Sequence, residues 1–247
     1  MIQRLKTKKV IAITHFTYTD FLSKFGVGGA HPGSIELTKE IIRTKNIDNN
    51  SLILDVGCGT GQTAAYLASE YGAIVTGIDL HPIMVEKAKK RMKKKRLPVE
   101  ILQCSIENVP LHDYTFDFVL SESVLSFVNK PTALSEIYRL LKDGGQLIAI
   151  EFTINKPLET AIENEIKQFY GFESLLTEQD WIHHFKQAGF TTIHVEQKQP
   201  LNKNDSIPEF DYSPNVELEL YDIMEQHHKM TLKYMDIWDY RIFTCNK

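Results

Sequence analysis

The stretch from Leu52 to Gln62, Leu-Ile-Leu-Asp-Val-Gly-Cys-Gly-Thr-Gly-Gln, constrains the fold of this chain more than any other. Its apolar first half predicts a buried strand, and a helical pattern follows at residues 63–70. Gly57, Gly59 and Gly61 predict a tight turn between the two, because glycine reaches positive φ and lets a ligand lie against bare backbone. The stretch therefore predicts a strand, a turn and a helix N-terminus that together face a ligand.

Two carboxylates near this turn indicate what kind of ligand it binds. A second apolar run, residues 73–78, ends at Asp79, where an acidic side chain can accept hydrogen bonds from the hydroxyls of a ribose. Asp55 lies two residues before the first glycine, and a carboxylate there suits a cationic amino-acid group better than a pyrophosphate, since like charges repel. We expect a nucleoside-containing cofactor across the tips of these two strands.

The acidic-x-Gly-x-Gly-x-Gly order at residues 55–61 resembles the first motif of the class I S-adenosylmethionine-dependent methyltransferases. The resemblance runs from about Ile35 to Thr153 and includes the Leu-Lys-Asp-Gly-Gly turn at 141–145, and it is closest to the small-molecule enzymes related to quinone biosynthesis. It implies an α/β fold, a doubly wound Rossmann-like sheet of seven strands whose last two form an antiparallel hairpin, with a helical substrate-side cap. Another Rossmann-like strand-turn-helix unit is the alternative.

The resemblance also implies the cofactor, S-adenosyl-L-methionine, and a set of contacts at the strand tips. Ser105 stands where family members usually carry an aspartate for the adenine amino group, and a neutral hydroxyl would make a weaker bond there. The residues implied to bind the cofactor are Asp55, Gly57, Cys58, Gly59, Gly61, Gln62, Asp79, Leu80, Ser105, Ile106 and Ser121.

His31 and Glu122 are the candidates for a general base. Glu122, like Ser121, ends a strand expected at 115–123, at the tip that the resemblance places beside the methyl group. His31 lies in the glycine-rich segment 26–34, which we predict to be a loop, and a histidine titrates close to neutral pH. The resemblance implies that this loop and the preceding helix close over the cofactor, whereas the alternative is a flexible linker. Ser34 is the predicted N-cap of the next helix.

The rest of the chain alternates between predicted helices and strands, which favours one domain over residues 1–247. Within it we expect N-terminal helices and a lid loop at 15–46, a cofactor-binding core at 51–153, and substrate-side helices with the terminal hairpin at 154–247. Aromatic residues of the last part, Tyr170, Phe172 and Trp181, are candidates for the substrate pocket or for the core. Residues 199–214 are predicted to be disordered.

Several classes of protein and site are disfavoured. The net charge is −4, so the Lys/Arg-rich run at 87–96 is interpreted as a solvated helix face, with an anionic partner as the alternative. The tip at 121–124 lacks the Asn/Asp-Pro-Pro-aromatic sequence of enzymes that methylate base amino groups. No apolar run approaches the ~18 residues of a membrane span, the cysteines show no CxxC spacing, and the paired histidines at 183–184 and 227–228 point in different directions. We therefore expect a cytoplasmic protein without a metal site, membrane insertion or a nucleic-acid partner.

The predicted function is methyl transfer from S-adenosylmethionine to a small-molecule acceptor. An NAD(P)-dependent oxidoreductase is one alternative, although the G-x-G-x-G spacing differs from the dinucleotide fingerprint. A non-catalytic cofactor-binding module on the same fold is the other. The acceptor atom, which can be carbon, oxygen, nitrogen or sulfur, and the oligomeric state stay open.

Overall fold

The computed structural model describes residues 16–197 and 208–247, and its centre is a seven-stranded sheet in the order β4-β3-β2-β5-β6-β9-β7. Adjacent strands are parallel from β4 to β6, and β9 is antiparallel to both β6 and β7. This confirms the predicted α/β sheet with an antiparallel final pair. The strands are β2 Leu52–Val56, β3 Ile74–Asp79, β4 Glu100–Gln103, β5 Phe116–Glu122, β6 Leu141–Ile154, β7 Thr192–Glu196 and β9 Trp238–Asn246.

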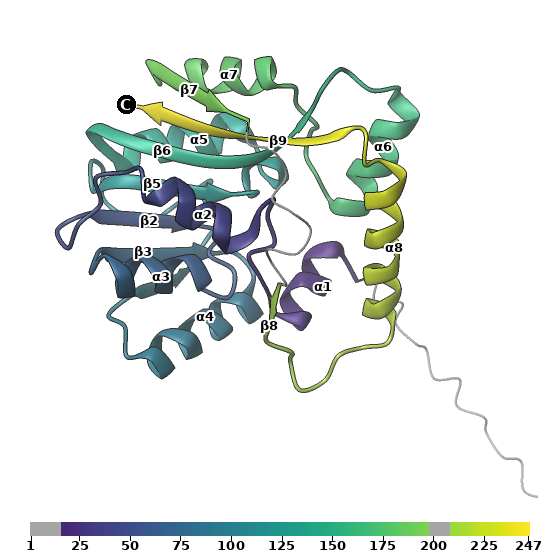
Figure 1. Cartoon of the computed structure of the whole chain (residues 1–247), viewed down its shortest axis with the longest axis horizontal. Coiled ribbons are helices and arrows are strands. Elements are labelled where there is room, and N and C mark those ends of the chain that lie inside the picture. Colours follow the sequence, from purple (N-terminus) through teal and green to yellow (C-terminus); the bar gives the residue numbers. More distant parts are fainter. Residues whose placement is uncertain (1–15, 198–207) are drawn as a thin grey trace, which may run out of the picture.

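Helices cover both faces of this sheet, and strand alternation decides which side chain meets which face (Figure 1). Ile53 packs with α2 Ser34–Ile42, α3 Gln62–Glu70 and α4 Pro82–Lys95, whereas its neighbour Leu54 packs with α5 Lys130–Leu140 and α7 Glu178–Gln187. Side chains fully buried on both faces explain why β2 reads as a continuous apolar run.

Three further helices, α1 Tyr18–Phe25, α6 Thr160–Tyr170 and α8 Glu219–Lys233, form a cap beyond one end of the sheet (Figure 1). Aromatic contacts join them, with Tyr18 and Tyr170 4.9 Å apart and Phe25 and Tyr221 5.1 Å apart between ring centroids. Asp20 of α1 contacts His81, which lies two residues beyond the end of β3. The cap therefore lies at the carboxyl ends of the parallel strands, the edge at which open α/β sheets bind their ligands.

Two predictions about the glycine-rich segment are wrong. Val27–Gly28 is not loop but a short strand, β1, antiparallel to β8 Glu209–Phe210, which lies in the stretch predicted to be disordered. Gly26 makes the approach possible, because a Cβ there would lie 2.2 Å from the carbonyl oxygen of Asp211. Ser34 is not an N-cap. Gly33 takes that position, and Ser34 is the first helical residue, with φ of 50°. Residues 198–207 lie outside the described part of the chain.

The connections after β5 and α5 are short. Residues Leu125–Phe127 form a short 3-10 helix, η1, and β6 begins at Leu141, directly after α5. The Asp143-Gly144-Gly145 turn thus lies within the range of β6, where the register against β5 shifts between Phe116 and Phe118. Within the described ranges, none of the helices combines the length and the apolar character needed to cross a bilayer.

Candidate functional site

The three glycines of the turn after β2 have different roles, although all have positive φ. A Cβ on Gly57 would lie 2.3 Å from Val124, and one on Gly61 would lie 2.7 Å from Met92, so these two glycines allow close packing. A Cβ on Gly59 would meet nothing within 4 Å. Gly59 is therefore the glycine whose bare backbone faces open space, where a ligand can lie.

Asp79 lies beside Gly59, as the sequence predicts. Its Oδ2 accepts a hydrogen bond from the Gly59 amide at 2.9 Å, and its Oδ1 accepts one from the His81 amide at 2.8 Å. Burial raises the pKa of this carboxyl, and the two amides oppose that shift in part. Because a carboxylate offers about four lone-pair directions, these two bonds fix its orientation and leave capacity for ligand hydroxyls.

Two buried acceptor atoms near the turn are unpaired. Asp55 is 2 % exposed, and its Oδ2 has no hydrogen-bond partner among residues 16–197 and 208–247. The same holds for Gln62 Oε1, at the start of α3. Burial, followed by the nearby Glu122 carboxylate, raises the pKa of Asp55 well above its usual range. A buried unpaired polar group costs about 1–3 kcal/mol, so both atoms fit a ligand that brings N–H donors.

His31 and Glu122, predicted separately as catalytic candidates, lie side by side. The Glu122 carboxylate accepts hydrogen bonds from the Thr38 hydroxyl of α2 and, at 2.7 Å, from the Thr63 hydroxyl of α3. His31 Nε2 lies 3.6 Å from Glu122 Oε1, and its Nδ1 lies 3.1 Å from the carbonyl oxygen of Pro32. The structure thus brings the glycine-rich segment and two helices together on one carboxylate.

Ser121 does not share this position, which corrects the expectation that it faces the reacting centre with Glu122. Adjacent strand residues point to opposite faces, and Ser121 is fully buried, with its hydroxyl donating to Glu151 Oε1 at 3.2 Å. Glu151 also accepts bonds from the Leu125 amide at 3.0 Å and the Ser126 hydroxyl at 3.2 Å. Burial raises the pKa of Glu151 to about 7, although these donors lower it in part.

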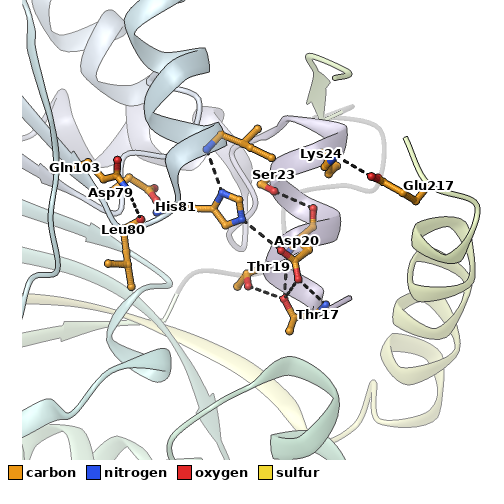
Figure 2. A network of polar contacts seen from close by, with 11 residues as sticks. Thr17, Thr19, Asp20, Ser23, Lys24, Asp79, Leu80, His81, Gln103 and Glu217 are labelled. Carbon is orange, nitrogen blue, oxygen red and sulfur yellow. Dashed lines mark hydrogen bonds and ion pairs between the residues drawn. The ribbon is translucent and has the colours of Figure 1, made fainter. Parts of the chain in front are cut away.

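The remaining predicted cofactor contacts are split between surface and core. Leu80 is 68 % exposed at the tip of β3, and its carbonyl oxygen accepts a bond from Gln103 at 3.4 Å (Figure 2). Ser105 Oγ accepts a bond from the Glu107 amide at 3.1 Å. The side chain of Ile106 is 4 % exposed and belongs to the core, which leaves mainly its backbone for a ligand. The Cys58 side chain is buried against Gly77.

Sequence reasoning did not identify three residues that shape the site, namely Thr38, Thr63 and His81. Thr38 and Thr63 hold Glu122 from residues distant in sequence, and no local pattern marks such a contact. His81 did carry a signal, because it directly precedes Pro82 at a helix start and so occupies the N-cap position. Figure 2 shows His81 between Asp79 and Asp20 of α1.

A groove of about 880 Å³ lies between η1 and the cap helices. Aromatic side chains line part of it, and Tyr170 is among them, although it is largely buried in the same cluster as Phe172. Phe172 and Trp181 do not line the groove, and Trp181 lies in the core between the sheet and α7. No cluster of three or more metal-binding side chains occurs in the ranges that the structure describes. The absence of a metal stays a prediction. The aromatic members of the lining are Phe16, Tyr18, Phe127, Phe169 and Tyr170.

Comparison with known proteins gives consistent matches. Residues 54–149 match the family model described as a methyltransferase domain. The uncharacterized methyltransferase YodH of Bacillus subtilis is 37 % identical over 231 residues, covering 93 % of this chain and 99 % of that protein. Phosphoethanolamine N-methyltransferase 1 of Arabidopsis thaliana is 29 % identical over 177 residues, covering 70 % of this chain but 35 % of the plant enzyme.

A solved structure shares the fold. Phosphoethanolamine N-methyltransferase 2 of Haemonchus contortus, solved in complex with S-adenosyl-L-methionine, superposes with a TM-score of 0.77 at 23 % identity. The alignment covers 95 % of this chain and 58 % of that one. At this identity the match supports the architecture, sheet and cap together.

Proposed function

The chain belongs to the class I S-adenosylmethionine-dependent methyltransferases, and we propose that it methylates a small-molecule acceptor in the groove between its cap helices. The observation that carries the proposal is the placement of Asp79 against Gly59, beside open space and two unpaired buried acceptors. Such a site would suit a ligand that has a ribose and an α-amino group and that can lie against bare backbone.

We propose specific roles for the residues at the strand tips. Asp79 would accept hydrogen bonds from the ribose hydroxyls, and Asp55 and Gln62 would accept them from the amino-acid end of the cofactor. Gly59 would let the cofactor lie on the backbone, and the exposed Leu80 side chain would cover the adenine. Further contacts with the cofactor would come from Gly57, Cys58, Gly61, Ser105 and Ile106, whereas Ser121 would act through Glu151.

The acceptor is proposed to lie in the aromatic groove. Its volume of about 880 Å³ falls in the range of small-molecule sites, and phosphoethanolamine enzymes among the relatives act on a small molecule, as their names state. The bound cofactor supplies a methyl group already activated on a sulfonium. The protein therefore has to align the acceptor with that group and exclude water, and orientation alone can give effective molarities of roughly 10⁵ M or more.

His31 and Glu122 are proposed to act as one pair. Thr38 and Thr63 hold the Glu122 carboxylate in place 3.6 Å from His31 Nε2, so an ion pair with His31 can keep the loop against the tip of β5. Because both ring nitrogens of His31 face an acceptor atom, it can take a proton from a substrate only after the loop moves. If His31→Ala leaves turnover of the true substrate intact, the pair holds the loop and is not catalytic.

The test of the cofactor site is titration calorimetry with S-adenosylhomocysteine. We expect Asp79→Ala to weaken binding at least ~10-fold, or about 1.4 kcal/mol, because the ribose would lose its acceptor. Asp48→Ala is the matched control, since Asp48 also accepts a backbone amide bond, from Asn50 at 2.9 Å, but precedes β2 at the opposite end of the strand. Equal affinity of the Asp79 variant and the wild type would rule out the ribose role.

The alternatives make different predictions. An NAD(P)-dependent oxidoreductase would be protected against heat by NADH and not by S-adenosylhomocysteine. A non-catalytic module would bind the cofactor but show no turnover across a broad acceptor panel. We propose, further, that residues 1–247 form a single domain of a cytoplasmic protein without a nucleic-acid partner.

A further inference from the structure

We propose that His81 is a positioning residue that docks helix α1 against the cofactor-binding tip of β3, so that cofactor affinity depends on Asp20, which lies on another element. The inference rests on the proposed cofactor site and adds to it a mechanical link between that site and the cap. Figure 2 shows the residues that form this link.

His81 is held on one side by its own helix and strand tip. Its backbone amide donates to Asp79 Oδ1 at 2.8 Å, and its ring Nδ1 accepts a bond from the Ile83 amide at 3.3 Å, which caps α4. Because Nδ1 is an acceptor, the ring proton resides on Nε2. Nε2 lies 3.5 Å from Asp20 Oδ1, so the imidazole is oriented to donate to α1.

Asp20 divides its two carboxylate oxygens between two tasks. Oδ2 accepts from the Thr17 amide at 2.8 Å and the Thr17 hydroxyl at 2.6 Å, which completes the capping box of α1, while Oδ1 faces His81. Burial would raise the pKa of Asp20, but the bonds from Thr17 and His81 outweigh it and lower that pKa. The N-terminal turn of α1 is thus built around the carboxylate that meets His81.

The other sides of α1 contact the cap. Lys24 pairs with Glu217 at 3.0 Å, just before α8 (Figure 2), and the Tyr18 ring packs edge-on against Tyr170 of α6. Tyr18 also lines the groove assigned to the acceptor. Helix α1 therefore connects the tip of β3 with the walls of the groove, and His81–Asp20 is a polar contact between α1 and that tip.

Docking of α1 affects affinity through the fraction of molecules that are competent to bind. If the cofactor binds well only when α1 is docked, its apparent dissociation constant rises as the docked fraction falls. Losing the His81–Asp20 contact should then weaken binding without removing any group that touches the cofactor.

Asp20→Asn and His81→Asn test the link. In Asp20→Asn the amide oxygen can still cap α1, but an NH₂ group can then face the Nε2 proton. In His81→Asn the side chain keeps an N-cap acceptor for α4 and is too short to reach Asp20. We expect each variant to raise the dissociation constant of S-adenosylhomocysteine about fivefold, or about 1 kcal/mol, and the double variant to add nothing further.

Helix α7 supplies a matched control. Its capping box has the same residues, with Asp180 Oδ2 accepting from the Thr177 amide at 2.9 Å and the Thr177 hydroxyl at 2.6 Å, and α7 packs on the sheet face opposite α4. Asp180→Asn should leave the affinity within twofold of wild type. Hydrogen exchange adds a direct readout, because S-adenosylhomocysteine should protect the amides of α1 in the wild type and much less in Asp20→Asn.

The link is overturned if Asp20→Asn and His81→Asn both bind like the wild type, if their effects add, or if Asp180→Asn weakens binding equally. In those cases the proposed cofactor site still stands, provided that Asp79→Ala weakens binding. Failure of the wild type to bind S-adenosylhomocysteine would remove the cofactor site and the link together.

Discussion

Two buried carboxylates, Asp55 on β2 and Glu151 on β6, lie on opposite faces of the sheet and differ in how the protein treats them. Glu151 is completely buried and takes bonds from two backbone amides and two hydroxyls. Asp55 is almost as deeply buried, yet one of its oxygens has no partner within the described ranges.

The difference separates a structural polar cluster from a binding site. Around Glu151 the chain supplies its own hydrogen-bond donors to the carboxylate. These donors come from residues 121–126, which include the end of β5 and the start of η1. Around Asp55 the chain leaves an acceptor unsatisfied at the end of β2, just before the turn in which Gly59 faces open space. An incomplete buried polar site is costly unless a ligand completes it.

Removing Glu151 should have the largest effect on stability. Glu151→Ala would leave the amides of Val124 and Leu125 and two hydroxyls buried without an acceptor, at about 1–3 kcal/mol for each unsatisfied group. We expect a loss of roughly 4 kcal/mol in the free energy of unfolding, measured by urea denaturation. Glu151→Gln, which keeps the size and one acceptor oxygen, is the control and should lose much less. Equal losses for the two variants would show that the donors around Glu151 contribute little.

The burial of Glu151 should also make the free energy of unfolding depend on pH, with an effect slightly smaller than that of Glu151→Ala. The pKa of Glu151 is raised from 4.5 to about 7 by burial, so the folded state binds a proton that the unfolded state releases. Stability contributed by this group is therefore present below about pH 4.5 and is lost as the pH rises towards 7, by up to about 3 kcal/mol.

Glu151→Gln isolates this contribution from the other acids. The difference in unfolding free energy between wild type and Glu151→Gln should change in favour of the variant as the pH rises from 4.5 to 7, and stay constant above that. Urea denaturation at a series of pH values measures it. A difference that does not vary with pH would mean that Glu151 titrates normally and that its donors fully offset its burial.

Asp55→Asn should change cofactor binding more than stability. Because burial and the neighbouring Glu122 raise the pKa of Asp55, removing its charge should leave stability unchanged or slightly higher near neutral pH. The same change should weaken S-adenosylhomocysteine binding about tenfold, or ~1.4 kcal/mol, since the amino-acid end of the cofactor loses a charged acceptor. Titration calorimetry measures the affinity of Asp55→Asn and Glu151→Gln for S-adenosylhomocysteine, and urea denaturation measures their stability. An Asp55 variant that is unstable but binds normally would remove the distinction between the two carboxylates.

The sequence allowed prediction of the region around Asp55 but not of the contacts that complete it. Apolar runs and spaced glycines locate β2, β3 and the turn, because burial on both faces and positive φ leave a local signature. The threonines that hold Glu122 and the β1–β8 pair depend on residues distant in the chain, and a two-residue strand has no periodicity to detect.

One error was avoidable from strand geometry. Ser121 and Glu122 are consecutive in β5, so they cannot both face the reacting centre. Alternation from Leu120, which packs on the α2–α3–α4 face, assigns Glu122 to that face and Ser121 to the other. Glu151 could not be assigned in this way, since its partners become apparent only once η1 is placed beside β6.

Leu80→Ala should give the smallest effect and tests whether the open side of the site extends past Asp79. Leu80 is 68 % exposed, so its truncation should change the unfolding free energy by less than about 0.5 kcal/mol. If the side chain covers the adenine, the variant should bind S-adenosylhomocysteine about threefold more weakly, or ~0.6 kcal/mol. Leu218→Ala, at a leucine that is 80 % exposed beside α8, is the control and should change neither quantity. A Leu80 variant with wild-type affinity would place the adenine elsewhere and confine the ligand-facing surface to the turn and the two carboxylates.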